Sequence, residues 1–224
     1  MLIDRSVQGA HHAGSDQPEN GTSGRCPWAE DCHTRFVPFP DEPFASQVRV
    51  LPYQDRWAEE GAALVERLRR LFPGAPAVDH IGSTSIPGMP AKDCIDAMVR
   101  VPSLQAFNSD ALLAEGFRER PEEWNHEETL GATTYPKRVF APPLGGRSVN
   151  IHIRERGSPT ARYALLFRDY LRADAVSRRA WGQFKVRLAE TASDIYSYGQ
   201  IKSTVYPLVM TLAQRWADET GWGP

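Results

Sequence analysis

The sequence predicts a mixed α/β (α+β) fold in which helices cover a small mixed sheet and the C-terminal part is helical. Two observations predict it. Helical and strand patterns follow one another as helix, strand, strand, helix, strand and strand, and the last third of the chain is helical throughout. This order does not fit a doubly wound parallel fold, in which helices and strands would alternate one by one.

Length and composition describe an ordinary globular protein with room for one domain and appendages. The chain has 224 residues, of which 41% are hydrophobic and 24% charged. Its formal net charge of −2 gives no bulk attraction to nucleic acid, so a nucleic-acid partner is not expected. No apolar run approaches the roughly 20 residues of a membrane helix. Sparse cysteines and an N-terminus without an apolar secretory region predict a cytoplasmic protein with no membrane partner.

The chain divides into an N-terminal extension over 1–46, a main domain over 47–217 and a C-terminal tail over 218–224. The extension is rich in Gly, Ser, Pro, Asp and His and shows no sustained helical or strand period, so we expect it to be mobile. Its CPWAEDCH segment has a cysteine spacing longer than that of zinc ligands, and no second pair follows. This favours a loop over a zinc site.

Four elements are expected in the first half of the main domain. An amphipathic period predicts the first helix, which Asp55 can cap. Short apolar runs predict two strands, and a proline-serine pair opens a second helix. The expected elements are a helix over 55–72, strands over 77–81 and 94–101, and a helix over 102–115.

A hairpin is expected next. Extended stretches over 133–140 and 148–153 flank a Pro-Pro-Leu-Gly-Gly turn, which predicts that they pair. Side chains alternate across a strand, so the apolar residues of the second stretch share one face. Asn150 and His152 share the other face.

The remainder predicts three helices. Ser158-Pro159 is typical of a helix start, because proline is tolerated in the first turn. A second helix begins at Asp174. Apolar spacing predicts a third through 201–216, which we expect to be kinked or broken near Pro207.

The segment HIGSTSIPGMPAKDCIDAMV, over 80–99, places small residues directly after an apolar strand. Gly82 lets the chain turn and lets backbone N–H groups approach an anion, and the Ser83 hydroxyl adds a donor. The spacing matches neither the P-loop nor the Rossmann glycine pattern. On these residues alone, a plain tight turn is the commoner interpretation.

Asp96 lies in the apolar run that follows this segment's loop. An unpaired carboxylate there would be strongly destabilising or would shift its pKa. Asp96 therefore needs a cation, either a metal or a basic partner such as Lys92. Asp93 is nearer the loop and is expected to be solvated.

A polar pocket beside Asp96 is one interpretation of the expected hairpin. His152 and Asn150 share a strand face, and Arg138 on the preceding strand can lie across from His152. A hydrogen-bonded structural role is an equal alternative for this histidine.

The segment 154–187 holds nine basic and three acidic residues. Most of the basic residues should lie on solvated helix faces. Arg168 and Lys185 are best placed beside buried aromatic residues to line an anion site, because guanidinium and ammonium groups bind phosphate or carboxylate.

HIGSTSIPGMPAKDCID resembles the signature of the GrpB family, a set of bacterial proteins related to the nucleotidyltransferase superfamily. Further parts of the resemblance follow in order: VRVLPYQDRW, NIHIRERGS, LFRDYLR, FKVRLAE and YGQIKSTV. Together they cover about residues 47–217. The resemblance implies a nucleotidyltransferase-like core with a helical C-terminal part.

In that superfamily a glycine-serine pair cradles the triphosphate, and three carboxylates bind two divalent metals. Carried over, the resemblance implies that Gly82-Ser83 holds phosphate and that Asp96 is the first carboxylate. Met98 stands at the second carboxylate position, where a thioether is a poor magnesium ligand. Asn150 and His152 stand where the third is sought. We therefore expect one Mg²⁺ or Mn²⁺ on Asp96 and His152, or no metal.

The resemblance implies a pocket for a nucleotide or another phosphorylated small molecule, with Asp96 or His152 as the base of any transfer reaction. The alternative is a non-catalytic accessory or interaction module, because GrpB-like domains are also joined to dephospho-coenzyme A kinase. A third hypothesis, modification of hydroxylated antibiotics, rests on superfamily analogy alone. The residues expected to line the pocket are His80, Gly82, Ser83, Thr84, Lys92, Asp96, Arg138, His152 and Arg168.

Overall fold

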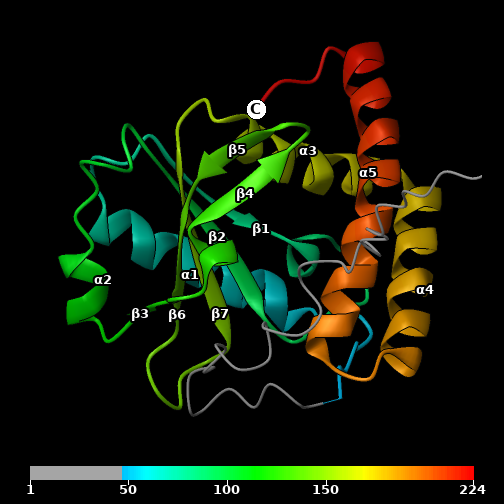
Figure 1. The fold of residues 1–224 in the computed structure, drawn as a ribbon, viewed down its shortest axis with the longest axis horizontal. Coiled ribbons are helices and arrows are strands. Elements are labelled where there is room, and N and C mark those ends of the chain that lie inside the picture. Colours follow the sequence, from blue (N-terminus) through cyan, green and yellow to red (C-terminus); the bar gives the residue numbers. More distant parts are fainter. Residues whose placement is uncertain (1–46) are drawn as a thin grey trace, which may run out of the picture. The chain divides into compact units, whose positions relative to one another are not determined.

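The computed structural model describes residues 47–224 (Figure 1). The expectations for 1–46, including the CPWAEDCH segment, lie outside the described residues. The described elements are α1 (Arg56–Leu71), β1 (Ala77–Ile81), β2 (Ile95–Val101), α2 (Asp110–Ala114), β3 (Arg118–Glu119), β4 (Glu127–Leu130), β5 (Thr133–Pro136), β6 (Arg138–Ala141), β7 (Val149–Glu155), α3 (Pro159–Ala173), α4 (Ala175–Thr191) and α5 (Ile195–Thr220), with short 3-10 turns at Ser83–Ser85 and Glu123–Asn125.

A five-stranded mixed sheet forms the centre of the fold, in the order β1-β2-β7-β6-β3. Strands β2 and β7 are parallel, and the other neighbouring pairs are antiparallel. Strands β4 and β5 form a separate antiparallel hairpin. The predicted fold class, a small mixed sheet covered by helices with a helical C-terminal part, is confirmed.

Helix α1 covers one face of the sheet. Its buried stripe packs against the apolar residues that alternate along β2 and β7, and this side of the sheet holds the largest apolar core. The core includes Trp57, Leu64, Leu68, Ile95, Ala97, Val99, Phe140, Ile151 and Ile153. The intervening residues of β2 and β7 therefore point to the opposite face.

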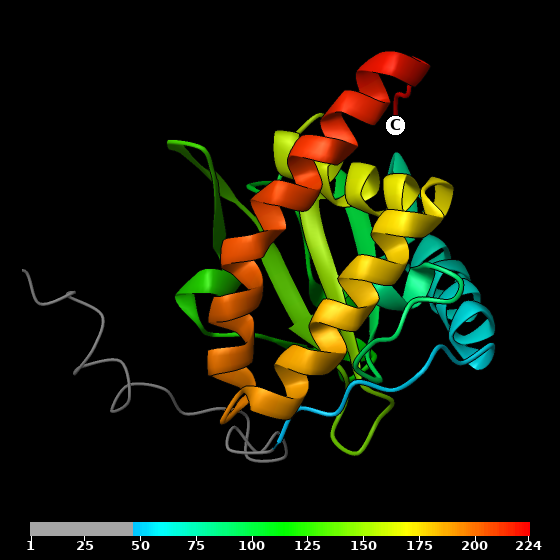
Figure 2. The same cartoon turned by 90° about the vertical axis from the view of Figure 1, so that its right-hand side faces the viewer.

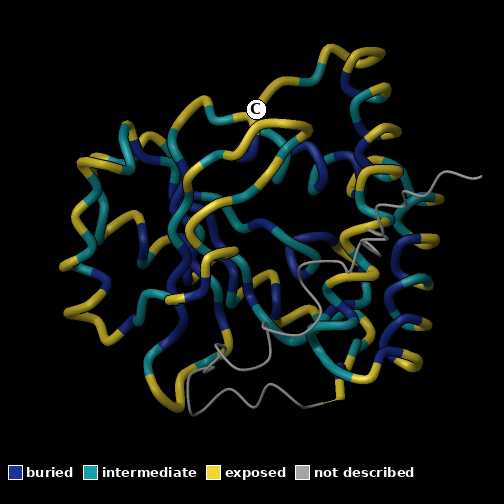
Figure 3. The backbone as a smooth tube through the Cα atoms, in the orientation of Figure 1, coloured by how far each residue is buried: buried dark blue, intermediate teal, exposed yellow. Residues whose placement is uncertain are grey.

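Helices α3, α4 and α5 cover that opposite face (Figures 1 and 2). Ile81 and Met98 of the sheet pack against Ala161 and Leu165 of α3. Figure 3 shows the buried backbone running along the sheet and the inward sides of the helices. None of the helices in 47–224 is sufficiently long and apolar to cross a membrane.

Side chains cap the three C-terminal helices, at the predicted starts Ser158 and Asp174 and at Asp194, where α5 begins several residues before the predicted 201–216. The Asp174 and Asp194 carboxylates accept hydrogen bonds from Ser177 N (2.6 Å) and Ser197 N (2.8 Å) at the starts of α4 and α5. Helix α5 is continuous through Pro207, so of the two predicted alternatives, a kink or a break, the break does not occur.

Two predicted elements differ from the structure. The helix expected over 102–115 is only the five-residue α2, because the Leu104 N–H donates instead to Glu155 Oε1 at 2.8 Å. The strand expected over 133–140 divides at Lys137, whose N–H donates to the His126 carbonyl at 2.8 Å. Its first half pairs with β4, and only its second half joins the sheet.

Asp93 is partly exposed, with 35% of its side-chain surface accessible, but it also binds three neighbouring side chains. Its Oδ1 accepts hydrogen bonds from Trp57 Nε1 (2.7 Å) and Arg147 Nη2 (2.5 Å), and its Oδ2 accepts one from Arg56 at 2.6 Å. Asp93 thus ties α1 and the loop before β7 to the start of β2.

Replacing Gly61 by alanine should destabilise the protein although alanine is the better helix former. The new methyl group would overlap the half-buried ring of His80, whose Nε2 lies 3.1 Å from Thr84 Oγ1. We expect the free energy of unfolding, measured by urea denaturation, to fall by about 1–3 kcal/mol. Gly74→Ala is the matched control, because open space surrounds Gly74. Equal stability of the two variants would contradict the clash.

Candidate functional site

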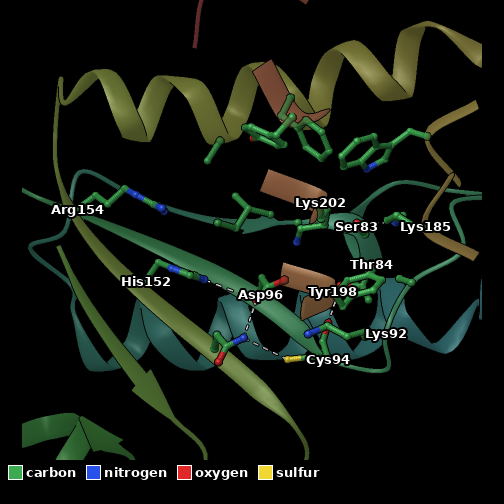
Figure 4. Close-up of a pocket in the computed structure, with 18 residues that line it drawn as sticks. Ser83, Thr84, Lys92, Cys94, Asp96, His152, Arg154, Lys185, Tyr198 and Lys202 are labelled. Atoms are coloured by element: carbon green, nitrogen blue, oxygen red, sulfur yellow. Dashed lines mark hydrogen bonds and ion pairs between the residues drawn. The ribbon is translucent and has the colours of Figure 1, made fainter. Parts of the chain in front are cut away.

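A cavity of about 390 Å³ lies between the sheet and helices α3, α4 and α5 (Figure 4). Its floor is formed by Asp96 on β2 and by Asn150 and His152 on β7, which the parallel pairing of the two strands brings side by side. The Gly82–Thr84 turn borders one end. The helices contribute aromatic and basic side chains from above, so the cavity is polar below and at one end, and aromatic above.

The turn and the carboxylate lie together, as the sequence predicted. Gly82 has a φ of 71° and ψ of −172°, a conformation that L side chains rarely adopt. A Cβ at this position would overlap the Asp96 carboxylate. Ser85 Oγ donates to the Gly82 carbonyl at 2.7 Å and fixes the turn. Glycine is therefore what allows the backbone to approach Asp96.

Asp96 is ionised and open to the cavity. Burial acts to raise its pKa, but hydrogen bonding and charge from His152, the Asn150 amide and the Lys92 charge together hold the pKa below its ordinary value. Asn150 Nδ2 donates to Asp96 Oδ1 at 2.9 Å, and His152 Nε2 lies 3.6 Å from the same oxygen. The Asp96 side chain keeps 27% of its surface exposed.

Arg120 fixes the orientation of Asn150, one of the two β7 residues that neighbour Asp96. Arg120 Nη2 donates to Asn150 Oδ1 at 3.0 Å, which turns the Asn150 amide N–H groups toward Asp96 and Cys94 Sγ. Burial lowers the pKa of His152, so its ring is neutral near pH 7. Its buried Nδ1 has no hydrogen-bond partner among residues 47–224.

Three lysines line the same cavity as Asp96, which is the one carboxylate among its described lining residues. Lys185 on α4 is 3% exposed, and its Nζ donates to Ser83 Oγ (2.8 Å) and to the Pro90 carbonyl (2.5 Å). Lys92 and Lys202 approach the ring of Tyr198, with Nζ atoms 6.0 and 5.9 Å from its centroid. Lys92 forms no direct ion pair with Asp96 in the described part of the chain and acts on it at longer range.

Burial, and to a smaller extent repulsion from neighbouring lysines, lowers the pKa values of Lys185 and Lys202. Burial, reinforced by the charges of Lys202 and Lys92, lowers the pKa of Lys185 to about 7. Burial and Lys92 likewise lower the pKa of Lys202. The cavity thus holds more positive charge than Asp96 can balance.

Arg154 also lines the cavity, but its charge is balanced. Its guanidinium donates to both carboxylate oxygens of Glu128 on the β4–β5 hairpin, at 2.6 and 2.8 Å. Its Nη1 lies 3.5 Å from Met98 Sδ. Met98, which stands where the resemblance implies a second carboxylate, is fully buried beside this guanidinium.

Arg138 does not line the cavity, and the prediction that it lies across from His152 is wrong. Arg138 pairs with Ile153, so its side chain lies on the α1 face of the sheet. It donates to both Glu119 oxygens at 2.6 and 2.7 Å and to Ser109 Oγ at 3.0 Å. These contacts make Arg138 a structural residue.

His80 and Arg168 lie at a second cavity of about 710 Å³ at the β1 edge of the sheet. Burial lowers the pKa of His80 to about 4, and its neutral Nε2 contacts Thr84 Oγ1, which in turn donates to the Cys94 carbonyl at 3.2 Å. Arg168 donates to Asp169 (2.7 Å) and to the His80 carbonyl (3.1 Å). His80 therefore braces the turn from behind, and neither residue belongs to the Asp96 cavity.

The residues of the Asp96 cavity do not fit a centre for two divalent metals. Within 47–224 no group of three or more His, Cys, Asp or Glu side chains is close enough to hold a metal ion. Asp96 and His152 are two potential metal ligands that lie 3.6 Å apart in the cavity. Lys92, Lys185 and Lys202 line the same cavity. Divalent cations of this kind need several oxygen ligands and are repelled by ammonium groups.

Sequence reasoning missed Tyr198, Lys202 and Tyr206, which line the cavity from α5. Their spacing of four residues puts them on one face of a helix and was a usable signal. Trp181 on α4 and the balanced Arg154 were also missed.

The GrpB protein family model matches residues 47–211. The chain belongs to the GrpB family. A dephospho-CoA kinase of Mycolicibacterium paratuberculosis is 34% identical over 217 residues, which are 85% of this chain and 53% of the kinase. The UPF0157 protein SCO7215 of Streptomyces coelicolor is 36% identical over 169 residues, which are 73% of this chain and 82% of that protein.

The crystal structure of GrpB from Enterococcus faecalis has the same fold. It matches with a TM-score of 0.63 and 24% sequence identity, over 75% of this chain and 99% of that one. The chain spans only about half the length of the dephospho-CoA kinase that it resembles, 53%.

Replacing Asp96 by asparagine should destabilise the protein at neutral pH, because the lysines lose the charge that offsets them. The folded-state pKa of Asp96 is lowered, so its contribution is present above the unfolded value and is lost as pH falls through the folded value. We expect a loss of about 1–3 kcal/mol in urea unfolding that is largest between about pH 5 and 7, shrinks below about pH 4 as Asp96 is protonated, and shrinks above pH 7 as Lys185 loses its charge.

Asp218→Asn is the control, since it removes one exposed carboxylate from α5. It should leave stability nearly unchanged. An Asp96→Asn variant as stable as wild type at neutral pH would contradict the charge balance described above.

Proposed function

We propose that this GrpB protein binds a nucleotide or another phosphorylated small molecule in the Asp96 cavity. The observation that carries the proposal is the convergence of Lys92, Lys185 and Lys202 on a cavity with one carboxylate. In the absence of a ligand the pKa values of Lys185 and Lys202 are lowered, chiefly by burial and further by repulsion from neighbouring lysines. An anion would relieve that repulsion, so its binding is favoured by more than its direct contacts.

The turn supplies the polar partners that a phosphate needs. Ser83 Oγ and Lys185 Nζ are 2.8 Å apart, so one phosphate oxygen can contact both. Gly82 has no side chain to keep the phosphate away from the backbone. For a transfer reaction, Asp96 is the group placed to accept a proton from an acceptor hydroxyl, because it is ionised and open to the cavity.

Removing either the buried Lys185 or the half-buried Lys202 should weaken nucleotide binding. We expect Lys185→Met and Lys202→Met each to lower the affinity for a panel of nucleoside mono-, di- and triphosphates about 10- to 100-fold, because a hydrogen bond to a charged group is lost. Isothermal titration calorimetry measures the affinity, and the melting temperature verifies folding.

Arg187→Met is the matched control. It removes one positive charge from α4 two residues after Lys185, where the side chain is 81% exposed. This variant should bind as wild type does. If the folded wild-type protein binds no nucleotide of the panel, with or without Mg²⁺ or Mn²⁺, the proposal is overturned.

A second candidate is an accessory or interaction module related to the domain joined to dephospho-coenzyme A kinase. Its specific support is the 34% identity to a kinase of about twice the matched length. Absence of ligand binding by an intact fold is the result that favours it over the first candidate.

A further inference from the structure

We propose that the ligand of the Asp96 cavity is a phosphomonoester bound as its metal-free dianion, with its organic group against the aromatic side of the cavity. This inference rests on the proposed function and specifies the ligand class. Three independent features of the cavity carry it: its charge balance, the side chains at the metal-ligand positions and the aromatic residues of the helices.

The charge balance matches a dianion. Lys92, Lys185 and Lys202 contribute three positive charges when protonated, and Asp96 contributes one negative charge. Arg154 adds no net charge to the cavity, because both carboxylate oxygens of Glu128 bind its guanidinium. The remaining excess of two positive charges matches a phosphomonoester, which carries about −1.5 to −2 near pH 7. A phosphodiester would leave one positive charge unbalanced.

The metal-ligand positions disfavour a phosphate that arrives with divalent cations. Met98 replaces the second carboxylate, and the Arg154 guanidinium lies 3.5 Å from its sulfur. A bound Mg²⁺ would add positive charge to a cavity that already has an excess, with Asp96 as the sole carboxylate to receive it. The lysines neutralise phosphate without such an ion.

The aromatic side of the cavity favours a planar or apolar organic group. Phe167, Trp181 and Tyr206 all line the cavity. Their ring centroids are 5.9 Å (Phe167–Trp181) and 4.9 Å (Phe167–Tyr206) apart. The buried indole N–H of Trp181 has no partner within residues 47–224 and can donate to a ligand acceptor. Inorganic phosphate would leave this side unused.

Titration of the site and ligand gives the inference a pH signature. Lys185 faces Ser83, Lys92, Asp96, Tyr198 and Lys202 across the cavity. Its pKa of about 7 means that affinity falls as pH rises above that value and the ammonium loses its proton. The second pKa of a phosphomonoester is about 6, so affinity also falls below it.

Asp96 stays ionised in this range, because its pKa lies below its ordinary value. Affinity should therefore be highest between about pH 6 and 7.

The experiment is calorimetry on the full chain with four probes: inorganic phosphate, phenyl phosphate, methyl phenyl phosphate and UTP, each with EDTA or with Mg²⁺. We expect phenyl phosphate to bind about tenfold or more tightly than inorganic phosphate and than its methyl diester, which has the same ring and one charge fewer. Mg²⁺ should not strengthen any of these interactions. Affinity for phenyl phosphate should fall about tenfold from pH 6.5 to 8.5.

Trp181→Leu tests the aromatic side, and should weaken phenyl phosphate binding while leaving inorganic phosphate unchanged. If this variant fails to fold, Tyr206→Leu provides the same comparison. Equal binding of the diester, or UTP binding that requires Mg²⁺ and exceeds that of phenyl phosphate, would overturn this inference and leave the proposed function standing. Binding of none of the probes or nucleotides to the folded protein would overturn both.

Discussion

The structure of the site depends on one ionised carboxylate that faces more positive charge than it can balance. Asp96 would be strongly destabilising in an apolar strand without partners. Here the Asn150 amide and the neutral His152 satisfy it from the next strand, and Lys92, Lys185 and Lys202 supply the opposite charge. The negative charge of Asp96 in turn offsets part of the cost of placing lysine ammonium groups in the cavity. Each group is stable because the others are present.

Several parts of the fold serve to bring these charges together. The parallel pairing of β2 with β7 places Asn150 beside Asp96, and Arg120 fixes the orientation of the Asn150 amide. Gly82 brings the backbone turn up to the carboxylate. Lys185 on helix α4 contacts Ser83, although the two residues are 102 positions apart in the sequence. The sheet therefore provides the negative side of the site and the helices provide most of the positive side.

Local sequence patterns predicted the sheet well. The strands at 77–81 and 94–101 follow from short apolar runs and the hairpin from its turn, and alternation along β7 placed Asn150 and His152 on one face. The parallel pairing of β2 with β7, which sets Asp96 beside them, was not predicted. The juxtaposition of the turn and Asp96 was predictable because both flank one short loop. Arg138 was misplaced because it pairs with Ile153 and not with His152, and a register that differs by one residue moves a side chain to the opposite face.

The helical half of the site was harder to predict, because helix packing is decided by contacts between residues distant in sequence. Lys185 was recognisable as a basic residue among buried positions, but its contact with Ser83 was not. Arg168 had the same local character and lies instead at the second cavity. Only the four-residue spacing of Tyr198, Lys202 and Tyr206 indicated that a lysine shares a buried helix face with aromatic rings.

The most direct test of the charge balance is to titrate the lysine side chains themselves. In protein labelled with ¹⁵N-lysine, the Nζ resonance of Lys185, assigned by comparison with the Lys185→Met spectrum, reports its pKa with and without phenyl phosphate. We expect Lys185 to titrate near its lowered pKa of about 7 in the free protein and at clearly higher pH in the complex. A Lys185 that titrates at the ordinary lysine value and does not respond to the phosphate would contradict the central claim.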